Sequence, residues 1–395
     1  MDIPALQRAL SEQKLDGWLL YDFHGQNPTA VGAVGLGGHL LTRRWFYLVP
    51  ARGEPRLLVH AIEAGSLPSH VAGARETYSS WQSLRQSLER LVSSLPGRRL
   101  AMEYFPMAAI PYLSRVDAGT LELVRSLGVE VVSSADLVQR FLCRWTPHQV
   151  ASHVRALRAI DDAKDAAFAY VGESHRRGYD PTEDQVQDFL MKRFADRGLV
   201  TDHPPIVAVN AHAGDPHYVP SRERPTPIRR GDLVLIDLWA KEARPDDPYA
   251  DITWVAFAGD RPPAKAEEIF RVTAEARDVG LATVRAAFRE ARSLQGWQVD
   301  RAVRDHIASK GYGDRFIHRT GHSIGTAAVH GDGANLDDLE THDTRELLPG
   351  TAFSIEPGIY LPDEGLGVRS EIDVVLTDEG PQVFSKIQEE LVRIR

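Results

Sequence analysis

GDLVLIDLWAK (231–241) and YADITWVAFAG (249–259) are the two stretches from which the fold of this chain is inferred. Both are mainly apolar, with residue types that favour strands, and the short segment between them predicts that the strands pair as a hairpin. Each strand contains an acid, Asp237 in the first and Asp251 in the second. Because a buried carboxylate requires a counter-charge, a salt bridge or a turn cap would be the simpler explanation for either acid alone.

Two further acids lie in strand-like apolar settings, Glu356 in FSIEPGIY and Glu371 in VRSEIDVV. Four carboxylates buried together repel one another, and burial would raise their pKa values strongly unless cations neutralise them. Few basic residues lie nearby, which favours hard divalent cations. His322, in HRTGHSIG, adds an imidazole, and this ligand mixture suits manganese, cobalt, iron or zinc better than calcium. We expect two ions rather than one.

The composition is that of a folded protein with more than one domain. A chain of 395 residues is too long for one typical core, and 43% apolar with 26% charged residues is ordinary for a globular protein. The net charge of -9 and the isoelectric point near 5.9 leave little attraction to phosphate backbones. We therefore expect no nucleic-acid partner.

Cys143 is the only cysteine, which excludes an intramolecular disulfide and a zinc site made of thiolates. The first residues, MDIPALQRALSEQK, lack the apolar centre of a signal peptide, and no run of about 18 apolar residues occurs. We therefore expect no membrane partner and a cytoplasmic location.

Residues 1–145 are predicted to form a small mixed domain. Helix-like and strand-like stretches alternate there, and Gly53 lies where a hairpin turn is expected. Thr146 followed by Pro147 is a good N-cap and first-turn pair, so a long helix should begin at this point. A second domain, residues 146–395, is predicted to begin with it.

This second domain is predicted to open with two helices and to continue with strands. Thr182 and Gln185 have the spacing of a capping box for the second helix, which should stop at Gly198. The elements expected after the hairpin are helices within 263–310 and strands within 350–361 and 367–377.

From about residue 150 to residue 395 the chain resembles the pita-bread metallopeptidases, which include methionine aminopeptidase, aminopeptidase P and prolidase. The resemblance is carried by five residues in the family's order, with matching strings around them: Asp237, Asp251, His322, Glu356 and Glu371. It implies that these five are ligands of two divalent ions, with manganese expected and cobalt or zinc as alternatives. A mixed N-terminal domain resembles the aminopeptidase P, prolidase and creatinase branch. Because creatinase lacks the metal ligands, their presence here favours a metallohydrolase.

The fold class implied by the resemblance is α+β. A C-terminal pita-bread domain of the creatinase and aminopeptidase type, residues 146–395, would follow a smaller mixed α/β domain of the creatinase N-terminal type, residues 1–145. The resemblance also implies a homodimer.

The resemblance assigns three histidines to the substrate pocket. His217, in HAGDPHYVP, resembles the histidine that contacts the N-terminal side of the substrate. His330, in AVHGDG, resembles one beside the scissile amide, and His318 is a third pocket histidine.

Two arginines are candidates for binding a substrate carboxylate. Arg345 resembles an arginine that prolidases and aminopeptidase P place near the substrate. Arg369, two residues before Glu371, should share a strand face with that ligand. It could therefore contact the substrate or pair with a metal carboxylate.

Two spacings depart from the family pattern. The step from Asp237 to Asp251 is longer than usual, so ARPDDP (243–248) resembles an inserted hairpin tip, and the step from His322 to His330 is one residue longer. We expect the ligands to keep their places, whereas the shape of the pocket and the assignment of His330 depend most on these two departures.

The resemblance and the ligand chemistry together predict hydrolysis of the amide bond before proline. Two ions would bridge Asp237, Glu356 and Glu371 around a shared water that attacks the amide. Glu356 would take the proton of this water, His330 and the ions would stabilise the oxyanion, and His217 would position the substrate.

The predicted substrates are short proline-containing peptides. We favour an Xaa-Pro dipeptidase, because Arg345 could hold a dipeptide carboxylate through two hydrogen bonds. An aminopeptidase P that acts on longer Xaa-Pro peptides is the alternative. A non-catalytic peptide-binding member of the fold, or a lyase or amidinohydrolase on the same scaffold, is a more remote possibility.

Overall fold

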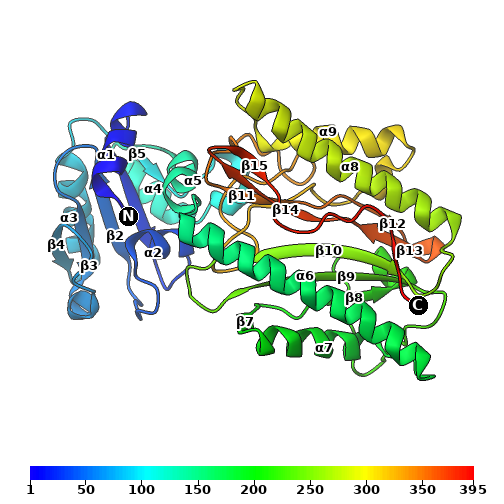
Figure 1. Ribbon diagram of the computed structural model, residues 1–395. Helices are drawn as coiled ribbons and strands as arrows, with labels where there is room; N and C mark the ends of the chain where they lie inside the picture. Colours follow the sequence, from blue (N-terminus) through cyan, green and yellow to red (C-terminus); the bar gives the residue numbers. More distant parts are fainter. The chain divides into compact units, whose positions relative to one another are not determined.

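The chain forms two compact units. The computed structural model describes residues 1–395, which divide between Leu142 and Cys143 into a smaller and a larger unit (Figure 1). The sequence predicts the division after residue 145. Both units combine helices with sheets.

The smaller unit is built on a six-stranded sheet with the order β4-β3-β2-β1-β5-β6. Strand β2 is antiparallel to both of its neighbours, and the other adjacent strands are parallel. Gly53, between β2 and β3, has a φ of +101°, which favours glycine, so the predicted hairpin turn is confirmed. The elements of this unit are α1 (Ile3–Glu12), β1 (Gly17–Asp22), α2 (Pro28–Val34), β2 (Trp45–Pro50), β3 (Arg56–His60), β4 (Ala74–Tyr78), α3 (Trp81–Ser93), β5 (Arg99–Met102), α4 (Ala118–Ser126), β6 (Glu130–Ser133) and α5 (Ala135–Leu142).

Glu103 is a buried acid directly after β5, with 1% of its surface exposed. Its carboxylate accepts hydrogen bonds from Trp18 Nε1 (2.6 Å), Asn27 Nδ2 (2.8 Å) and Ser134 Oγ (3.2 Å). Burial nevertheless raises its pKa to about 7, because the charged form loses more hydration than these donors replace.

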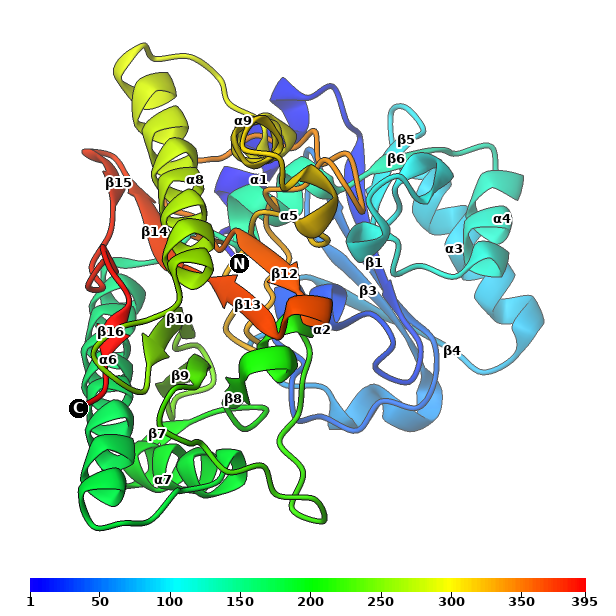
Figure 2. The ribbon, with the colours of Figure 1, turned by 90° about the vertical axis from the view of Figure 1, so that its right-hand side faces the viewer.

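The larger unit has two helical layers with strands between them. Helices α6 and α7 lie on one side of the β9–β10 hairpin, and β12, β13 and α8 lie on the other (Figure 2). The elements of this unit are α6 (Pro147–Arg176), α7 (Glu183–Asp196), β7 (Leu199–Val200), β8 (Ile206–Val209), β9 (Leu233–Glu242), β10 (Ala250–Phe257), α8 (Ala264–Arg289), α9 (Gly296–Ser309), β11 (Ala352–Ile355), β12 (Gly358–Leu361), β13 (Leu366–Arg369), β14 (Ile372–Thr377), β15 (Gly380–Gln382) and β16 (Val392–Arg393).

Helices α6 and α7 begin at the predicted caps. Thr146 and Gln149 form a capping box at α6, in which each side chain accepts the backbone N–H of the other residue. Thr182 and Gln185 do the same at α7, and Gly198 after this helix has a φ of +68°. These two sequence predictions are confirmed.

Side-chain alternation in β9 and β10 gives the hairpin two different faces. Even-numbered residues, among them Ile236, Leu238 and Ile252, pack into the apolar layer formed with α6 and α7. Odd-numbered residues, among them Asp237 and Asp251, therefore point to the opposite side. The two acids thus face the second half of the unit.

The opposite side is formed by two small sheets, β11-β14-β15 and β12-β13. Strand β13 packs against β9 and β10, and β14 packs against β10. Glu356 directly follows β11, and Glu371 lies between β13 and β14, so both acids come close to the hairpin. None of the helices is both long and apolar enough to cross a lipid bilayer.

Candidate functional site

The five predicted ligands come from separate elements of the larger unit. Asp237 lies in β9, Asp251 in β10, Glu356 after β11 and Glu371 between β13 and β14, while His322 lies in the segment between α9 and β11. The Glu356 N–H donates to the Thr320 carbonyl (2.7 Å), which fixes the histidine segment beside β11.

Asp251, His322 and Glu371 form the tightest part of the site. One ligand atom from each of these residues lies within 4.8 Å of the others. His322 Nε2 is 3.4 Å from Asp251 Oδ2 and 3.5 Å from Glu356 Oε1. The Glu356 side chain is 15% exposed, whereas those of Asp251 and His322 are nearly inaccessible. Among Asp251, His322 and Glu356, the Glu356 side chain is therefore the one that solvent reaches most easily.

Unpaired oxygen atoms indicate where a cation would bind. Asp251 Oδ1 and Glu371 Oε1 are buried and have no hydrogen-bond partner. Burial raises the pKa of both acids well above their ordinary ranges, and the carboxylates of Asp237 and Glu356 raise them further. Such a cluster is unfavourable without a counter-charge, and hard divalent cations prefer oxygen ligands. The donor set therefore fits divalent metal ions.

His322 is oriented as a metal ligand should be. Its Nδ1 lies 3.0 Å from the Ser323 carbonyl oxygen, which can only accept, so Nδ1 carries the proton. Nε2 then directs its lone pair towards Asp251 and Glu356. Burial lowers the pKa of His322, which favours the neutral ring that binds metals.

Arg369 lies among the acids and is 4% exposed. Its guanidinium donates to Asp237 Oδ2, to Thr253 Oγ1 (3.0 Å) and to the Tyr360 hydroxyl (3.2 Å). Thr253 Oγ1 in turn donates to Glu371 Oε2 (2.7 Å). Of the two roles predicted for Arg369, these contacts support pairing with a metal carboxylate.

Arg345 is buried in an internal ion pair. Its Nε and Nη2 donate to the carboxylate of Asp343 (2.9 and 2.6 Å), and its Nη1 donates to the Asp332 carbonyl oxygen (2.7 Å). The side chain of Arg345 is only 3% exposed. A substrate carboxylate would therefore have to replace Asp343 before this arginine could bind it.

His318 is hydrogen-bonded within the protein at both ring nitrogens. Its Nδ1 donates to the Arg319 carbonyl oxygen (2.7 Å), so Nε2 accepts the hydrogen of the Tyr360 hydroxyl (2.7 Å). Burial lowers the pKa of His318 to about 3, which keeps the ring neutral. Its two ring nitrogens are thus already used within the protein.

His330 and His217 lie on the solvent side of the site. The rings of His330 and His322 are 4.2 Å apart between centroids. The electrostatic interaction with the neighbouring His322 ring lowers the pKa of His330 most, and burial, Arg319 and His217 add to this effect. His217 is exposed and lies close enough to His330 to influence the pKa of that ring. This placement is consistent with two histidines that contact a bound substrate.

Thr253 and Tyr360 belong to the site but are not among the predicted residues: Thr253 donates to the ligand Glu371, and Tyr360 is hydrogen-bonded to His318 and Arg369. Strand alternation contains the signal for Thr253, because it lies two residues from Asp251 in β10. Glu356 lies outside β12, so alternation gives no such signal for Tyr360.

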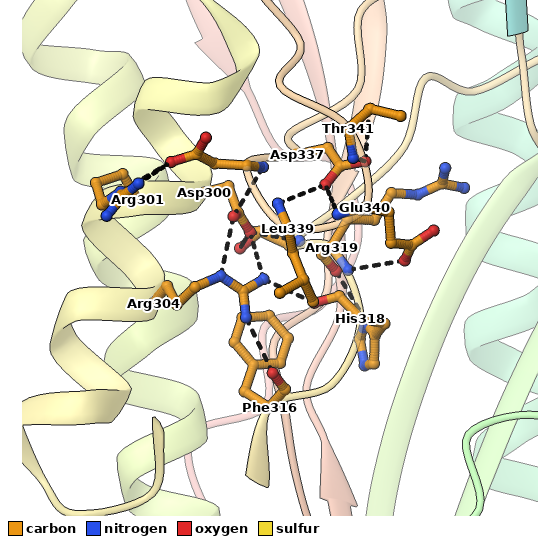
Figure 3. A network of polar contacts seen from close by, with 12 residues as sticks. Asp300, Arg301, Arg304, Phe316, His318, Arg319, Asp337, Leu339, Glu340 and Thr341 are labelled. Carbon is orange, nitrogen blue, oxygen red and sulfur yellow. Dashed lines mark hydrogen bonds and ion pairs between the residues drawn. The ribbon is translucent and has the colours of Figure 1, made fainter. Parts of the chain in front are cut away.

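A further polar network supports the segment that carries the histidines (Figure 3). Asp300, a fully buried acid of α9, accepts hydrogen bonds from Thr320 N–H (2.9 Å) and Thr320 Oγ1 (2.6 Å) and pairs with Arg304 (3.0 Å). Arg304 also donates to the carbonyl oxygens of Phe316 (2.9 Å) and His318 (2.8 Å). Helix α9 therefore fixes this segment through side chains.

Comparison with known proteins gives concordant matches. The sequence pattern of metallopeptidase family M24 matches residues 154–378. The uncharacterized peptidase YqhT of Bacillus subtilis is 35% identical over 47% of this chain, and the match spans about half (48%) of that protein. The Xaa-Pro dipeptidase of Pyrococcus furiosus is 34% identical over 65% of this chain and 67% of its own length.

A solved structure matches along the whole chain. The dipeptidase PepE from Mycobacterium ulcerans superposes with a TM-score of 0.74 at 24% sequence identity, covering 99% of this chain and 96% of that one. This likeness extends through both units and confirms the predicted fold class.

Proposed function

Because the chain belongs to metallopeptidase family M24, we propose that it hydrolyses the amide bond before proline in short peptides, using divalent ions held by the five predicted ligands. The observation that carries the proposal is the approach of donor atoms from Asp251, His322 and Glu371 within 4.8 Å, with an unpaired oxygen on both acids. A relative named Xaa-Pro dipeptidase supports the substrate class. The predicted family and the metallopeptidase class are confirmed by the family match.

The ions would supply positive charge that lowers the pKa of the attacking water and polarises the substrate carbonyl. We expect two ions, which Asp251, His322 and Glu371 would hold together with Asp237 and Glu356. Manganese is the expected metal, and cobalt and zinc suit the same ligands.

Glu356 is the residue to which we assign proton transfer. Its Oε1 accepts a hydrogen bond from Ser354 Oγ (3.1 Å), and its backbone is anchored on Thr320, so the carboxylate has a defined direction. It takes one proton from the attacking water and gives it to the proline nitrogen when the amide bond breaks. The water oxygen stays on the new carboxyl group of the product.

His330 and His217 would act on the substrate. A neutral His330 can donate a hydrogen bond to the carbonyl oxygen of the scissile amide, where negative charge develops. The exposed His217 would hold the N-terminal side of the peptide. His318 would support the floor of the pocket through Tyr360, to which it is hydrogen-bonded.

An aminopeptidase P is the second candidate, and the state of Arg345 is the observation that favours it. The dipeptidase prediction relies on this arginine to bind the C-terminal carboxylate of a dipeptide. Because Arg345 is paired with Asp343, the C-terminal carboxylate of a dipeptide would find no free partner at this arginine. A longer peptide would not need a carboxylate partner at this position. The substrate's length therefore decides between the two activities.

The test uses metal-stripped protein with manganese, cobalt or zinc added back. Hydrolysis of an Xaa-Pro dipeptide is compared with that of an Xaa-Pro-Xaa tripeptide. Cleavage of the dipeptide alone would establish the dipeptidase, and efficient cleavage of the tripeptide would establish the aminopeptidase. No cleavage with any of the three metals would refute the peptidase proposal.

Glu356→Gln serves as the catalytic control. Glutamine has the shape of glutamate but cannot take the proton, so we expect kcat to fall at least about a hundredfold. Glu379→Gln, at an exposed position between β14 and β15, should leave kcat unchanged. Equal activity of Glu356→Gln and the parent protein would contradict the assigned role.

A further inference from the structure

Lys241 is a buried lysine on the same face of β9 as Asp237. Alternation along the strand directs residues 237 and 241 to one side, and Lys241 is 7% exposed. The hydrogen bonds of its ammonium go to backbone carbonyl oxygens. These acceptors are Arg244 (3.1 Å), Pro245 (3.2 Å), Asp247 (3.2 Å) and Thr326 (2.6 Å).

The four carbonyl groups belong to two segments that are distant in sequence. Residues 244–247 belong to the connection 243–249 between β9 and β10, which contains the hairpin tip, and Thr326 belongs to the 323–330 loop. A second hydrogen bond joins the same segments, from the Tyr249 N–H to the Gly325 carbonyl oxygen (3.0 Å). The tip and the loop are therefore held together as one unit around the ammonium.

The 323–330 loop is closed by its own backbone. The Gly325 N–H donates to the Val329 carbonyl oxygen (2.9 Å), and the Gly331 N–H donates to the Ser323 carbonyl oxygen (2.7 Å). His330 stands at the end of this closed turn, paired with Ile324. A displacement of the loop at Thr326 would consequently be passed on to the His330 ring.

A lysine is well suited to this position. Its ammonium is a compact charge with three hydrogens, so it can satisfy several carbonyl oxygens that converge on one point. Burial lowers the pKa of Lys241, and the nearby Asp247 carboxylate opposes that shift. A neutral side chain would leave the carbonyl dipoles directed at one another, and the tip and the loop would move apart.

We propose that Lys241 is a positioning residue that fixes His330 over the metal site by tying the hairpin tip to the 323–330 loop. This inference rests on the proposed function, in which His330 contacts the scissile amide. Lys241 itself does not touch the substrate.

The test is a double-mutant cycle between Lys241→Met and His330→Ala. As a single substitution, Lys241→Met should lower kcat by about tenfold, with little change in KM and no change in metal content. A misplaced His330 would weaken mainly the contact that it makes in the transition state, so kcat falls and KM does not change. In the His330→Ala background, the same substitution should change kcat less than about twofold. An equal loss in both backgrounds, or loss of metal, would overturn the proposal.

A second measurement does not depend on activity. Hydrogen exchange should rise in peptides that cover residues 325–331 of Lys241→Met, while peptides around Asp237 and Glu371 keep the protection of the parent protein. If the parent protein cleaves no peptide but exchange rises in this way, the proposed function fails and the tie between tip and loop stands. If the parent protein cleaves Xaa-Pro bonds and exchange is unchanged, only the inference about Lys241 fails.

Lys241→Arg provides a variant that keeps the charge. A planar guanidinium cannot direct its hydrogens at the same four oxygens, so an intermediate loss of kcat, about threefold, is expected, and it should again vanish in the His330→Ala background. Lys192→Met, which removes an exposed lysine of α7, is the matched control and should change neither kcat nor exchange. A Lys241→Arg loss that persists without His330 would contradict the positioning role.

Discussion

Tyr360 is the residue that joins His318 to Arg369. Its hydroxyl donates to His318 Nε2 and accepts from Arg369 Nη1, and burial raises its pKa to about 12, so it keeps its proton at any physiological pH. We expect Tyr360→Phe to weaken manganese binding by about tenfold, because Arg369 loses a partner that fixes its position beside Asp237. Calorimetric titration of stripped protein measures this, and affinities within twofold of the parent would contradict it.

Glu103 gives the smaller unit a pH-dependent stability. Its pKa in the folded protein, about 7, lies above the ordinary 4.5, so the folded form holds a proton that the unfolded chain releases between these values. The stabilisation is complete below pH 4.5 and is lost as the pH rises through 7, amounting to about 3 kcal/mol. Urea unfolding should show a decrease of about 2 kcal/mol between pH 5.5 and pH 8, because the first part of the loss occurs below pH 5.5.

Glu103→Gln is the control for that titration. The amide cannot ionise, so the difference between the two pH values should shrink. An unchanged pH dependence in this variant would assign the effect to other groups.

At the scale of elements, helix α9 controls the segment that carries His318 and His322. Arg304→Gln removes the ion pair with Asp300 and two hydrogen bonds to carbonyl oxygens, so we expect lower metal affinity and a kcat reduced about tenfold. Activity and metal content, measured on the same preparation, check both effects.

Arg301 of the same helix offers a matched control for Arg304. It pairs with Asp338, and its side chain is 57% exposed (Figure 3). The Asp338 side chain is only 8% exposed but keeps its contact with His342 (2.7 Å), and Arg301 bonds to none of the carbonyl groups of the histidine segment, so Arg301→Gln should leave activity and metal affinity near those of the parent protein. Equal losses in the two variants would show that any charge removed from α9 has this effect.

Elements were the most predictable part of this protein. The starts of α6 and α7 are predictable because the capping residues Thr146 and Thr182 interact with residues only three positions further along the chain. Strands β9 and β10 are predictable because their alternating pattern is also a property of the local sequence.

The bonds from Thr320 to Asp300 could not be predicted in this way, because they join a helix to a segment 20 residues away and depend on how the two pack. Arg345 pairs with Asp343, only two residues away, but the local sequence does not show whether the arginine turns to this acid or to a substrate.

At the scale of the whole molecule, the acids of the site make stability depend on metal. Asp251 and Glu371 have pKa values raised well above their ordinary ranges, so the metal-free protein loses stability as the pH rises past those ordinary values and the acids ionise. Bound cations would compensate these charges. We therefore expect added manganese to raise Tm more at pH 8 than at pH 5.5.

Differential scanning calorimetry with and without manganese measures this difference. Asp251→Asn removes one of the charges, so its metal-free form should be less sensitive to pH than the metal-free parent. A manganese effect on Tm that is the same at both pH values would contradict the electrostatic account.

The two-faced β9 strand has a consequence for how the chain can change in length. Deleting or adding one residue between Leu233 and Asp237 would rotate every later side chain of β9 to the other face, sending Asp237 towards the apolar layer of α6 and exchanging it with a leucine or isoleucine. The tip at 243–248 lies outside the paired strands, where extra residues leave the register intact. Length variation among related proteins should therefore collect at this turn and be absent from the strand.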